Sequence, residues 1–178
     1  MQGFLLSAAL TTDIQRLGAA LSQRGWLCAT AESCTGGLIG ASLTAVPGSS
    51  AWFAGGVIAY ANSVKEQALG VDSLSLERHG AVSKSVVRQM AAGACRLTGA
   101  QAAMAVSGIA GPGGGTAHKP VGTVWLGFAA GGIVSAHKIW LPATRPVLRQ
   151  AVVALAVRGL LGLLHYPALA QGHALAKP

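Results

Sequence analysis

The sequence predicts a single α/β domain, a layered sandwich of helices around a mixed sheet. Helix-like and strand-like segments alternate along the 178 residues, as expected when helices cover the strands of a sheet. The composition, 52% hydrophobic with 25 glycines, suits buried strands and close helix–sheet contacts. A hairpin-like segment at 121–139, turning at Gly131-Gly132, adds an antiparallel pair and makes the sheet mixed.

The first half of the chain is expected to hold two helices and two strands. Apolar residues at four- and three-residue spacing predict a helix over 8–23: Leu10, Ile14, Leu17 and Leu21. A strand at 27–31 then leads through a polar turn into a helix that begins near Leu38. A loop at 46–50, rich in turn-forming residues, precedes a second strand at 53–60.

Polar side chains mark the expected helix starts of the second half. Asn62 is expected to cap a helix that ends near Leu69, and Ser73 or Ser75 to start a short turn that includes Glu77. Ser83 should cap a helix over 84–98 with this buried face: Val87, Met90, Ala91, Ala94 and Leu97.

The last part of the domain follows from the same signals. A strand at 102–106 and the hairpin come before a final helix, capped by Thr144 and ending near Leu164. The domain is expected to cover 1–166, and the small, alanine-rich segment at 167–178 is expected to fray.

Charge and cysteine content narrow the functional classes. The formal charge of +8 fits a small phosphorylated substrate as well as it fits DNA. No two Lys or Arg residues are adjacent and only 5% of residues are aromatic, which disfavours a nucleic-acid surface. Three cysteines without a C-x-x-C pair, and no convincing secretory leader, indicate a cytoplasmic protein. The uncharged run 33–64 is broken by polar turns, so we expect no membrane segment.

The turn Glu32-Ser33-Cys34-Thr35-Gly36-Gly37 is the most informative stretch of the sequence. Backbone amides at a helix N-terminus have no intrahelical acceptor, so they suit a phosphate or an oxyanion. Ser33 is therefore a candidate nucleophile for acyl transfer, although serine is also an ordinary helix N-cap. Cys34 is a rival nucleophile, because a helix N-terminus favours the thiolate.

Tyr60 and Lys65 form a second candidate group. If Asn62 is the N-cap, Lys65 lies in the first helical turn, where the helix dipole disfavours a cation. Partial burial would also lower its pKa, so that the neutral amine becomes available as a general base. A solvated lysine beside a tyrosine at the edge of the core is the plainer interpretation of this spacing.

The loop that follows the strand at 102–106, from Ser107 to Lys119, is the third group. Its glycines let backbone amides approach a ligand closely, yet the pattern matches neither a Walker A loop nor a Rossmann fingerprint. Lys119, Arg145 and Arg149 are candidate phosphate or carboxylate partners, or ordinary surface cations. The five histidines lack metal-ligand spacing and only five Asp and Glu residues exist, which favours a metal-free hydrolase without a cofactor.

Three separated motifs together resemble the CinA C-terminal domain family, whose active members are nicotinamide-nucleotide amidohydrolases. They are the turn at 31–37, the stretch from Val46-Pro47-Gly48-Ser49-Ser50 to Lys65, and the segment from Ser107 to Val124. The resemblance covers about residues 10–165. It implies a three-layer α/β/α fold with a mostly parallel sheet, and an assembly of identical subunits. It also implies conversion of nicotinamide mononucleotide to nicotinate mononucleotide and ammonia, in pyridine-nucleotide recycling.

The resemblance also implies roles for individual residues. Ser33 would attack the carboxamide, Lys65 would act as its base, and Tyr60 would assist proton transfer. Amides from Cys34 to Gly36 would hold the oxyanion. The other positions assigned to substrate binding are Thr35, Ser49, Ser50, Asn62, Ser107, Gly108, Gly111, Gly113, Gly114, Thr116, Lys119, Arg145 and Arg149.

The sequence departs from the family at two places. Ala117-His118 stands where relatives commonly carry proline and an acidic residue, and the last helix lacks the glycine–acidic pair that often precedes Arg145. Two alternatives stay open: a catalytically silent domain that binds a nucleotide or a partner protein, and a DNA-associated role. Retention of Ser33, Tyr60 and Lys65 favours the enzyme, because a binding module does not need all three.

Overall fold

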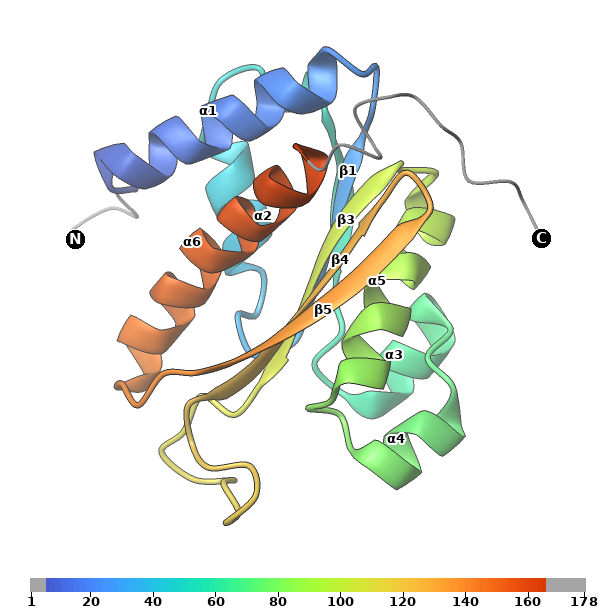
Figure 1. Cartoon of the computed structure of the whole chain (residues 1–178), viewed down its shortest axis with the longest axis vertical. Coiled ribbons are helices and arrows are strands. Elements are labelled where there is room, and N and C mark those ends of the chain that lie inside the picture. Colours follow the sequence, from blue (N-terminus) through green and yellow to red (C-terminus); the bar gives the residue numbers. More distant parts are fainter. Residues whose placement is uncertain (1–5, 166–178) are drawn as a thin grey trace.

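The computed structural model describes residues 6–165, which form a five-stranded sheet covered by helices on both faces (Figure 1). The helices and strands are α1 (Ala8–Ser22), β1 (Cys28–Glu32), α2 (Leu38–Thr44), a short 3₁₀ helix (Ser49–Ala51), β2 (Phe53–Ile58), α3 (Asn62–Leu69), α4 (Ser73–His79), α5 (Lys84–Thr98), β3 (Ala102–Gly108), β4 (Thr123–Ala130), β5 (Ile133–Trp140) and α6 (Arg145–Leu164). The segment 167–178, expected to fray, lies outside the described residues.

The sheet has the strand order β2-β1-β3-β4-β5. Its parallel part is β2-β1-β3, and the hairpin β4-β5 adds two antiparallel pairs at one side. All five residues of β1 are buried, as expected for a parallel strand with helices on both faces. The expected mixed α/β sandwich is therefore confirmed.

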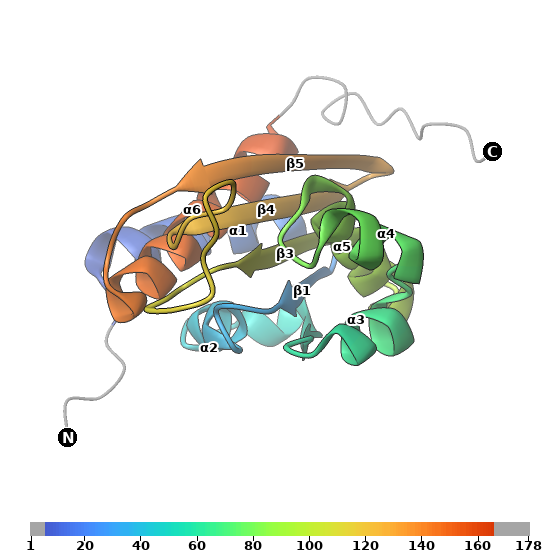
Figure 2. The ribbon, with the colours of Figure 1, turned by 90° about the horizontal axis from the view of Figure 1, so that it is seen from below.

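Helices α1, α2 and α6 cover one face of the sheet, and α3, α4 and α5 cover the other (Figures 1 and 2). Alternate residues of β3 serve the two layers: Met104 and Val106 pack with the first group of helices, and Ala103 and Ala105 with the second. The fold is thus the three-layer sandwich that the family resemblance implied.

Three glycines allow neighbouring helices and strands to approach closely. A Cβ atom at Gly93 of α5 would collide with the Leu69 carbonyl of α3, and one at Gly127 of β4 would collide with the Val87 carbonyl of α5. On the opposite face, Gly159 of α6 leaves room for the ring of Phe128. The glycine content of the sequence therefore serves interlayer packing as well as turns.

Helix α6 is long and apolar enough to span a membrane by length and composition alone. One face of the helix packs into the core, where these side chains are buried: Leu148, Val152, Val153, Ala156, Val157, Leu160 and Leu164. Val147 and Leu155 are exposed. On the solvent side, Arg158 forms an ion pair with Asp13 of α1 at 2.7 Å. Within the described residues, α6 is a core helix.

The helix starts were predicted with mixed success. Ser83 caps α5 as expected, its hydroxyl accepting from the Val86 amide at 3.4 Å. The prediction for Asn62 is wrong: Ala61 is the N-cap of α3 and Asn62 is the first helical residue. The expected start of α4 is confirmed: Ser73 is its first residue, and Asp72 caps the helix through the amides of residues 74 and 75.

Two further expectations need correction. Thr144 holds the N-cap position of α6, but its side chain makes no capping hydrogen bond. Leu97, placed on the buried face of α5, is 56% exposed, and Val86 is buried instead. The other four residues predicted for this face are buried. The predicted stripe therefore holds until the last turn of α5, where Leu97 faces solvent.

The start of α2 is held by a side chain that the sequence analysis did not identify. Glu32, the last residue of β1, is 1% exposed. Its carboxyl oxygens accept from the amides of Ile39 at 3.0 Å and Gly40 at 2.8 Å. Helix α2 begins only at Leu38, with Gly37 as N-cap at φ 91°, so Ser33 is not the cap. Glu32 thereby occupies the anion-binding end of α2 and ties it to β1.

We expect Gly93→Ala to lower the free energy of unfolding by about 1–3 kcal/mol, because the new methyl group would meet the α3 backbone. Gly162→Ala is the matched control: no atom lies within 4 Å of a Cβ at this helical position. That variant should gain up to about 1 kcal/mol from helix propensity. Urea unfolding monitored by circular dichroism measures both, and equal effects would contradict the close α3–α5 contact.

We expect Glu32→Gln to destabilise the protein by about 1–3 kcal/mol, since the amide nitrogen of glutamine cannot accept from the α2 backbone. Glu66→Gln, at an exposed position of α3, removes the same charge and should change stability little. Thermal unfolding of both variants measures their melting temperatures. Equal melting temperatures would mean that the Glu32 contacts do not hold α2.

Candidate active site

The three parallel strands end at the same edge of the sheet, and the sequence-predicted site residues lie around this edge. Ser33 follows β1, Tyr60 lies two residues after β2, and Ser107 lies near the end of β3. The Ser33 amide donates to the Val106 carbonyl at 3.0 Å, which places Ser33 beside Ser107. Since the chain leaves β1 towards β2 on one side and returns as β3 on the other, this is the switch point where open α/β sheets bind ligands.

Lys65 is brought to the Ser33 turn by two linked hydrogen bonds. The Glu32 carbonyl accepts from the Ala59 amide at 2.7 Å, and the Ala59 carbonyl accepts from Lys65 Nζ at 2.8 Å. A third bond runs from Nζ to the Tyr60 carbonyl at 3.1 Å. The lysine is 1% exposed, so its amine lies inside the protein rather than in solvent.

Burial lowers the pKa of Lys65 from its ordinary value of 10.5, and the nearby Cys34 thiol opposes this shift in part. A neutral amine has two N–H groups and one lone pair. Both N–H groups can be satisfied by the carbonyls of Ala59 and Tyr60. The lone pair then remains free to accept a proton, which is what a general base needs.

Cys34, the rival nucleophile, is placed unfavourably for that role. Burial raises the pKa of its thiol to about 11; Glu32 adds to the increase, and Arg145 and Arg149 counteract it. The expectation that a helix N-terminus would favour the thiolate is therefore wrong. The first turn of α2 starts four residues later and is already occupied by the Glu32 carboxyl group.

The turn between β1 and α2 exposes only part of the expected amide set. The Gly36 amide donates to the Ser33 carbonyl at 3.1 Å. Within residues 6–165, the amides of Cys34 and Thr35 donate to no protein oxygen. The Thr35 hydroxyl is fully buried and also lacks a partner among the described residues. Of the three amides predicted to hold an anion, those of Cys34 to Gly36, two are thus available.

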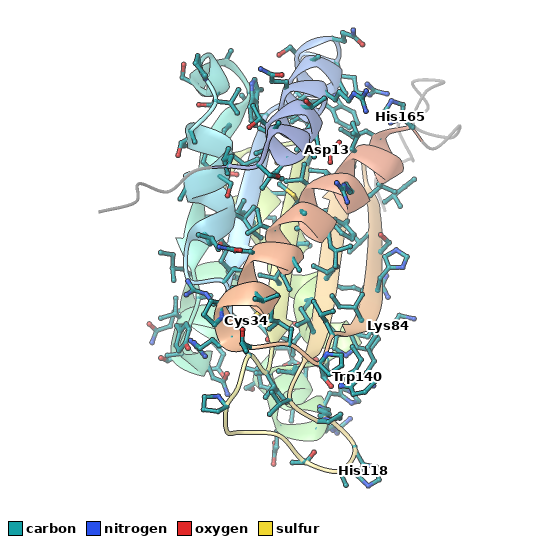
Figure 3. The ribbon with its side chains drawn as sticks, turned by 90° about the vertical axis from the view of Figure 1, so that its left-hand side faces the viewer. Asp13, Cys34, Lys84, His118, Trp140 and His165 are labelled. Carbon is teal, nitrogen blue, oxygen red and sulfur yellow. The ribbon has the colours of Figure 1, made fainter. Side chains whose placement is uncertain are left out.

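Arg145 and Arg149, four residues apart on one side of α6, converge on this edge of the sheet. Arg149 donates through Nη2 to the Thr35 carbonyl at 2.6 Å and so ties the turn to α6. Arg145 donates to the Gly111 carbonyl at 3.2 Å and to the Tyr60 hydroxyl at 3.1 Å. Tyr60 is 59% exposed, so this link lies at the protein surface. In Figure 3 the labelled Cys34 lies at the N-terminal end of α6.

The glycine-rich loop projects from the same edge (Figure 2). Gly111 and Gly114 have positive φ values of 73° and 85°, a conformation that glycine adopts most readily. Thr116 is used within the loop, since its hydroxyl accepts from the Lys119 amide at 3.1 Å. Lys119 itself points away, donating to the His79 carbonyl at 2.6 Å. The expectation that it faces a phosphate beside Ser33 therefore finds no support here.

Several predicted site residues are not brought to Ser33. Ser49 and Ser50 lie in the 3₁₀ helix before β2, and the Cys28 amide at the start of β1 donates to the nearby Trp52 carbonyl at 2.7 Å. They are thus at the opposite edge of the sheet from Ser33 within this chain. Asn62 is exposed at the start of α3, near Tyr60 in sequence.

Gly108 and Gly113 lie at the base and in the exposed part of the glycine-rich loop, respectively. Gly108 pairs with Val124 of β4, and a Cβ atom there would come within 2.6 Å of the Val124 side chain. Glycine at 108 therefore serves strand pairing. No group of three or more His, Cys, Asp or Glu side chains that could hold a metal ion occurs in the part of the chain that the structure describes.

Comparisons with known proteins identify the family. The family model of the CinA C-terminal domain matches residues 11–164. Nicotinamide-nucleotide amidohydrolase PncC of Enterobacter agglomerans is 50% identical over 139 residues, 77% of this chain and 85% of that protein. PncC of Pseudomonas putida is 46% identical over 154 residues, 86% of this chain and 96% of that protein.

A solved structure agrees with these matches. The competence/damage inducible protein CihA of Agrobacterium tumefaciens superposes with a TM-score of 0.86 at 40% identity, covering 91% of this chain and 99% of that one. The matched region includes β1, the Ser33 turn, Lys65 and the glycine-rich loop, all of which lie within residues 11–164. The chain therefore belongs to the CinA C-terminal domain family.

Proposed function

We propose that this protein is an amidohydrolase that converts nicotinamide mononucleotide to nicotinate mononucleotide and ammonia. The observation that carries the proposal is the buried Lys65 amine, held by two carbonyls next to the Ser33 turn. Relatives that match most of this chain carry the name nicotinamide-nucleotide amidohydrolase, which supports the choice of substrate.

The first half of the proposed reaction forms an acyl-enzyme. Neutral Lys65 accepts the proton of the Ser33 hydroxyl while Oγ attacks the carboxamide carbon. The carbonyl oxygen becomes an oxyanion, which the unpaired amides of Cys34 and Thr35 are placed to receive. Collapse of this intermediate breaks the C–N bond, and Lys65 returns its proton to the leaving nitrogen, which departs as ammonia.

The second half regenerates the enzyme. Lys65, neutral again, accepts a proton from water, whose oxygen attacks the acyl carbon. The tetrahedral intermediate expels Ser33 Oγ, which takes back the proton from Lys65 and releases the nicotinate product. Assistance by Tyr60 in these proton transfers stays a prediction: its carbonyl accepts from Lys65, whereas its hydroxyl is bound to Arg145.

The two arginines of α6 take different roles in this proposal. Arg149 is committed to the Thr35 carbonyl, so it positions the turn that carries the nucleophile. Arg145 is exposed and bonds only to a loop carbonyl and a tyrosine hydroxyl, so it can turn to an anionic group of the substrate. We further propose a cytoplasmic protein that assembles from identical subunits; light scattering on a size-exclusion column measures the assembly.

Ser33→Ala and Lys65→Ala should each lower ammonia release from nicotinamide mononucleotide by at least about 10³-fold, since each removes a reacting group. Cys34→Ala is the matched control and should retain most of the activity, because the backbone amide remains. The assay is run with EDTA. Activity that survives Ser33→Ala but not Cys34→Ala would contradict the assignment of the nucleophile; saturable binding without turnover in the wild type would indicate a silent domain.

The pH dependence of kcat/KM should reveal the base. Because burial lowers the pKa of Lys65, the neutral fraction should rise with pH through a midpoint below 10.5. The rate should therefore increase with pH along that limb and level off above it. Lys65→Arg stays charged throughout this range, so it should be inactive at every pH. A flat wild-type profile from about pH 6 to 10 would contradict a lysine base.

A further inference from the structure

A second cavity, outside the residues proposed for catalysis, is lined by an unusual number of cations. It has a volume of about 650 Å³, within the range of small-molecule sites. Five of the chain's thirteen Lys and Arg residues line it: Arg78, Lys84, Arg88, Lys119 and Lys138. We call this the basic cavity. The other lining residues are His79, Val82, Ser83, Ser85, His118 and Trp125.

The cations of the basic cavity come from four separate parts of the fold. Arg78 lies in the last turn of α4, and Lys84 and Arg88 lie in the N-terminal part of α5. Lys119 belongs to the glycine-rich loop, and Lys138 lies on β5. Figure 3 shows Lys84 and the loop residue His118 at the same end of the molecule as Cys34. No local sequence pattern predicts this convergence, because no two of these five residues are adjacent in the chain.

Within the described residues, no carboxylate forms an ion pair with a cation of the basic cavity. Among residues 6–165, the one ion pair joins Arg158 to Asp13 on the other face of the sheet. All five Asp and Glu residues of the chain lie in this range, and Glu32 is used by α2. Glu77, although next to Arg78 in sequence, forms no ion pair. Five like charges held around one hollow repel one another unless an anion enters.

Two further features suit a phosphate-bearing ligand. The cavity is bordered by Ser83 and Ser85, the N-cap and second residue of α5, so the positive end of a 15-residue helix adds to the side-chain charges. Trp125 supplies a half-buried aromatic ring on which a planar base can stack. Its partner on β5 in the strand register is Lys138, so ring and cation stand on the same face.

The basic cavity is a neighbour of the proposed catalytic residues and is separate from them. In the strand order, β4 lies two strands from β1, about 10 Å along the sheet. Between them stands Ser107 on β3, which is 1% exposed and pairs with Trp125. A ligand in the cavity is therefore divided from Ser33 by a buried strand end.

We propose that the basic cavity binds a ligand with two or more linked phosphate groups, of the nucleoside di- or triphosphate class. The linked phosphates lie among Lys84, Arg88 and Lys138, and the base lies against Trp125. A single phosphate carries too little charge to match five cations. This site is independent of the proposed amide hydrolysis, so it can be present or absent whatever the catalytic assay gives.

Isothermal titration calorimetry on the full chain tests the proposal with three probes: orthophosphate, pyrophosphate and ADP. Pyrophosphate should bind at least about tenfold more tightly than orthophosphate, and binding should weaken with salt. ADP should bind more tightly than pyrophosphate. It should also quench the tryptophan fluorescence, and this quenching should be lost in the Trp125→Phe variant. Equal affinity for all three probes, or no binding, overturns the proposal.

Matched charge reversals locate the site. Arg88→Glu should weaken pyrophosphate binding at least about tenfold, whereas Arg16→Glu, with the same charge change on an exposed residue of α1, should leave it within about twofold. Circular dichroism confirms that both variants fold. Ser33→Ala should still bind pyrophosphate. Full displacement of pyrophosphate by nicotinamide mononucleotide would assign the cavity to the substrate and overturn a second site. Tight binding of a single-stranded oligonucleotide, without binding of pyrophosphate, would show that the cavity binds nucleic acid instead and would also overturn the proposal.

Discussion

The proposed site depends on the turn between β1 and α2. The hydrogen bonds from the α2 amides to the Glu32 carboxyl group fix this turn in place. Glu32 ends the central strand β1, and its side chain grips the first turn of α2. The residues between these two anchors, 33 to 37, have little freedom left, and Arg149 fixes the Thr35 carbonyl from the other side. The proposed nucleophile thus sits on a turn whose two ends and middle are tied to three different elements before any substrate arrives.

This arrangement separates two electrostatic tasks. The positive end of the α2 dipole is occupied by Glu32, so an oxyanion must rely on the turn amides of Cys34 and Thr35. Lys65, by contrast, is buried without a carboxylate partner and is satisfied by carbonyl groups, which tolerate its neutral form. A protein with few Asp and Glu residues suits this chemistry, because a carboxylate near Lys65 would favour the protonated amine and make it a poorer base.

Local sequence signals predicted the elements well and the site in part. Apolar spacing and Ser83 located α5, and the Gly131-Gly132 turn located the hairpin, because these depend on neighbours in sequence. The predicted cap at Asn62 is wrong, because Ala61 takes the N-cap position of α3. The substrate-binding role of Lys119 stays a prediction, and its amine donates to the distant His79 carbonyl. Glu32 contacts amides seven and eight residues further along the chain, a longer separation than in the usual capping motifs. The basic cavity joins segments up to 60 residues apart. Such features arise from tertiary packing and leave no local pattern.

Strand β4 illustrates how closely the three layers are joined. Gly127 lets the α5 backbone approach it from one face, and Gly159 lets α6 close over Phe128 on the other. Because both helical layers rest on this strand, neither layer can separate from the sheet without exposing β4. In hydrogen-exchange terms, the amides shared by β3 and β4 should open only with global unfolding, whereas those of the glycine-rich loop exchange through local motion. The glycine-rich loop can therefore open locally while the strand pairs beneath it stay hydrogen-bonded.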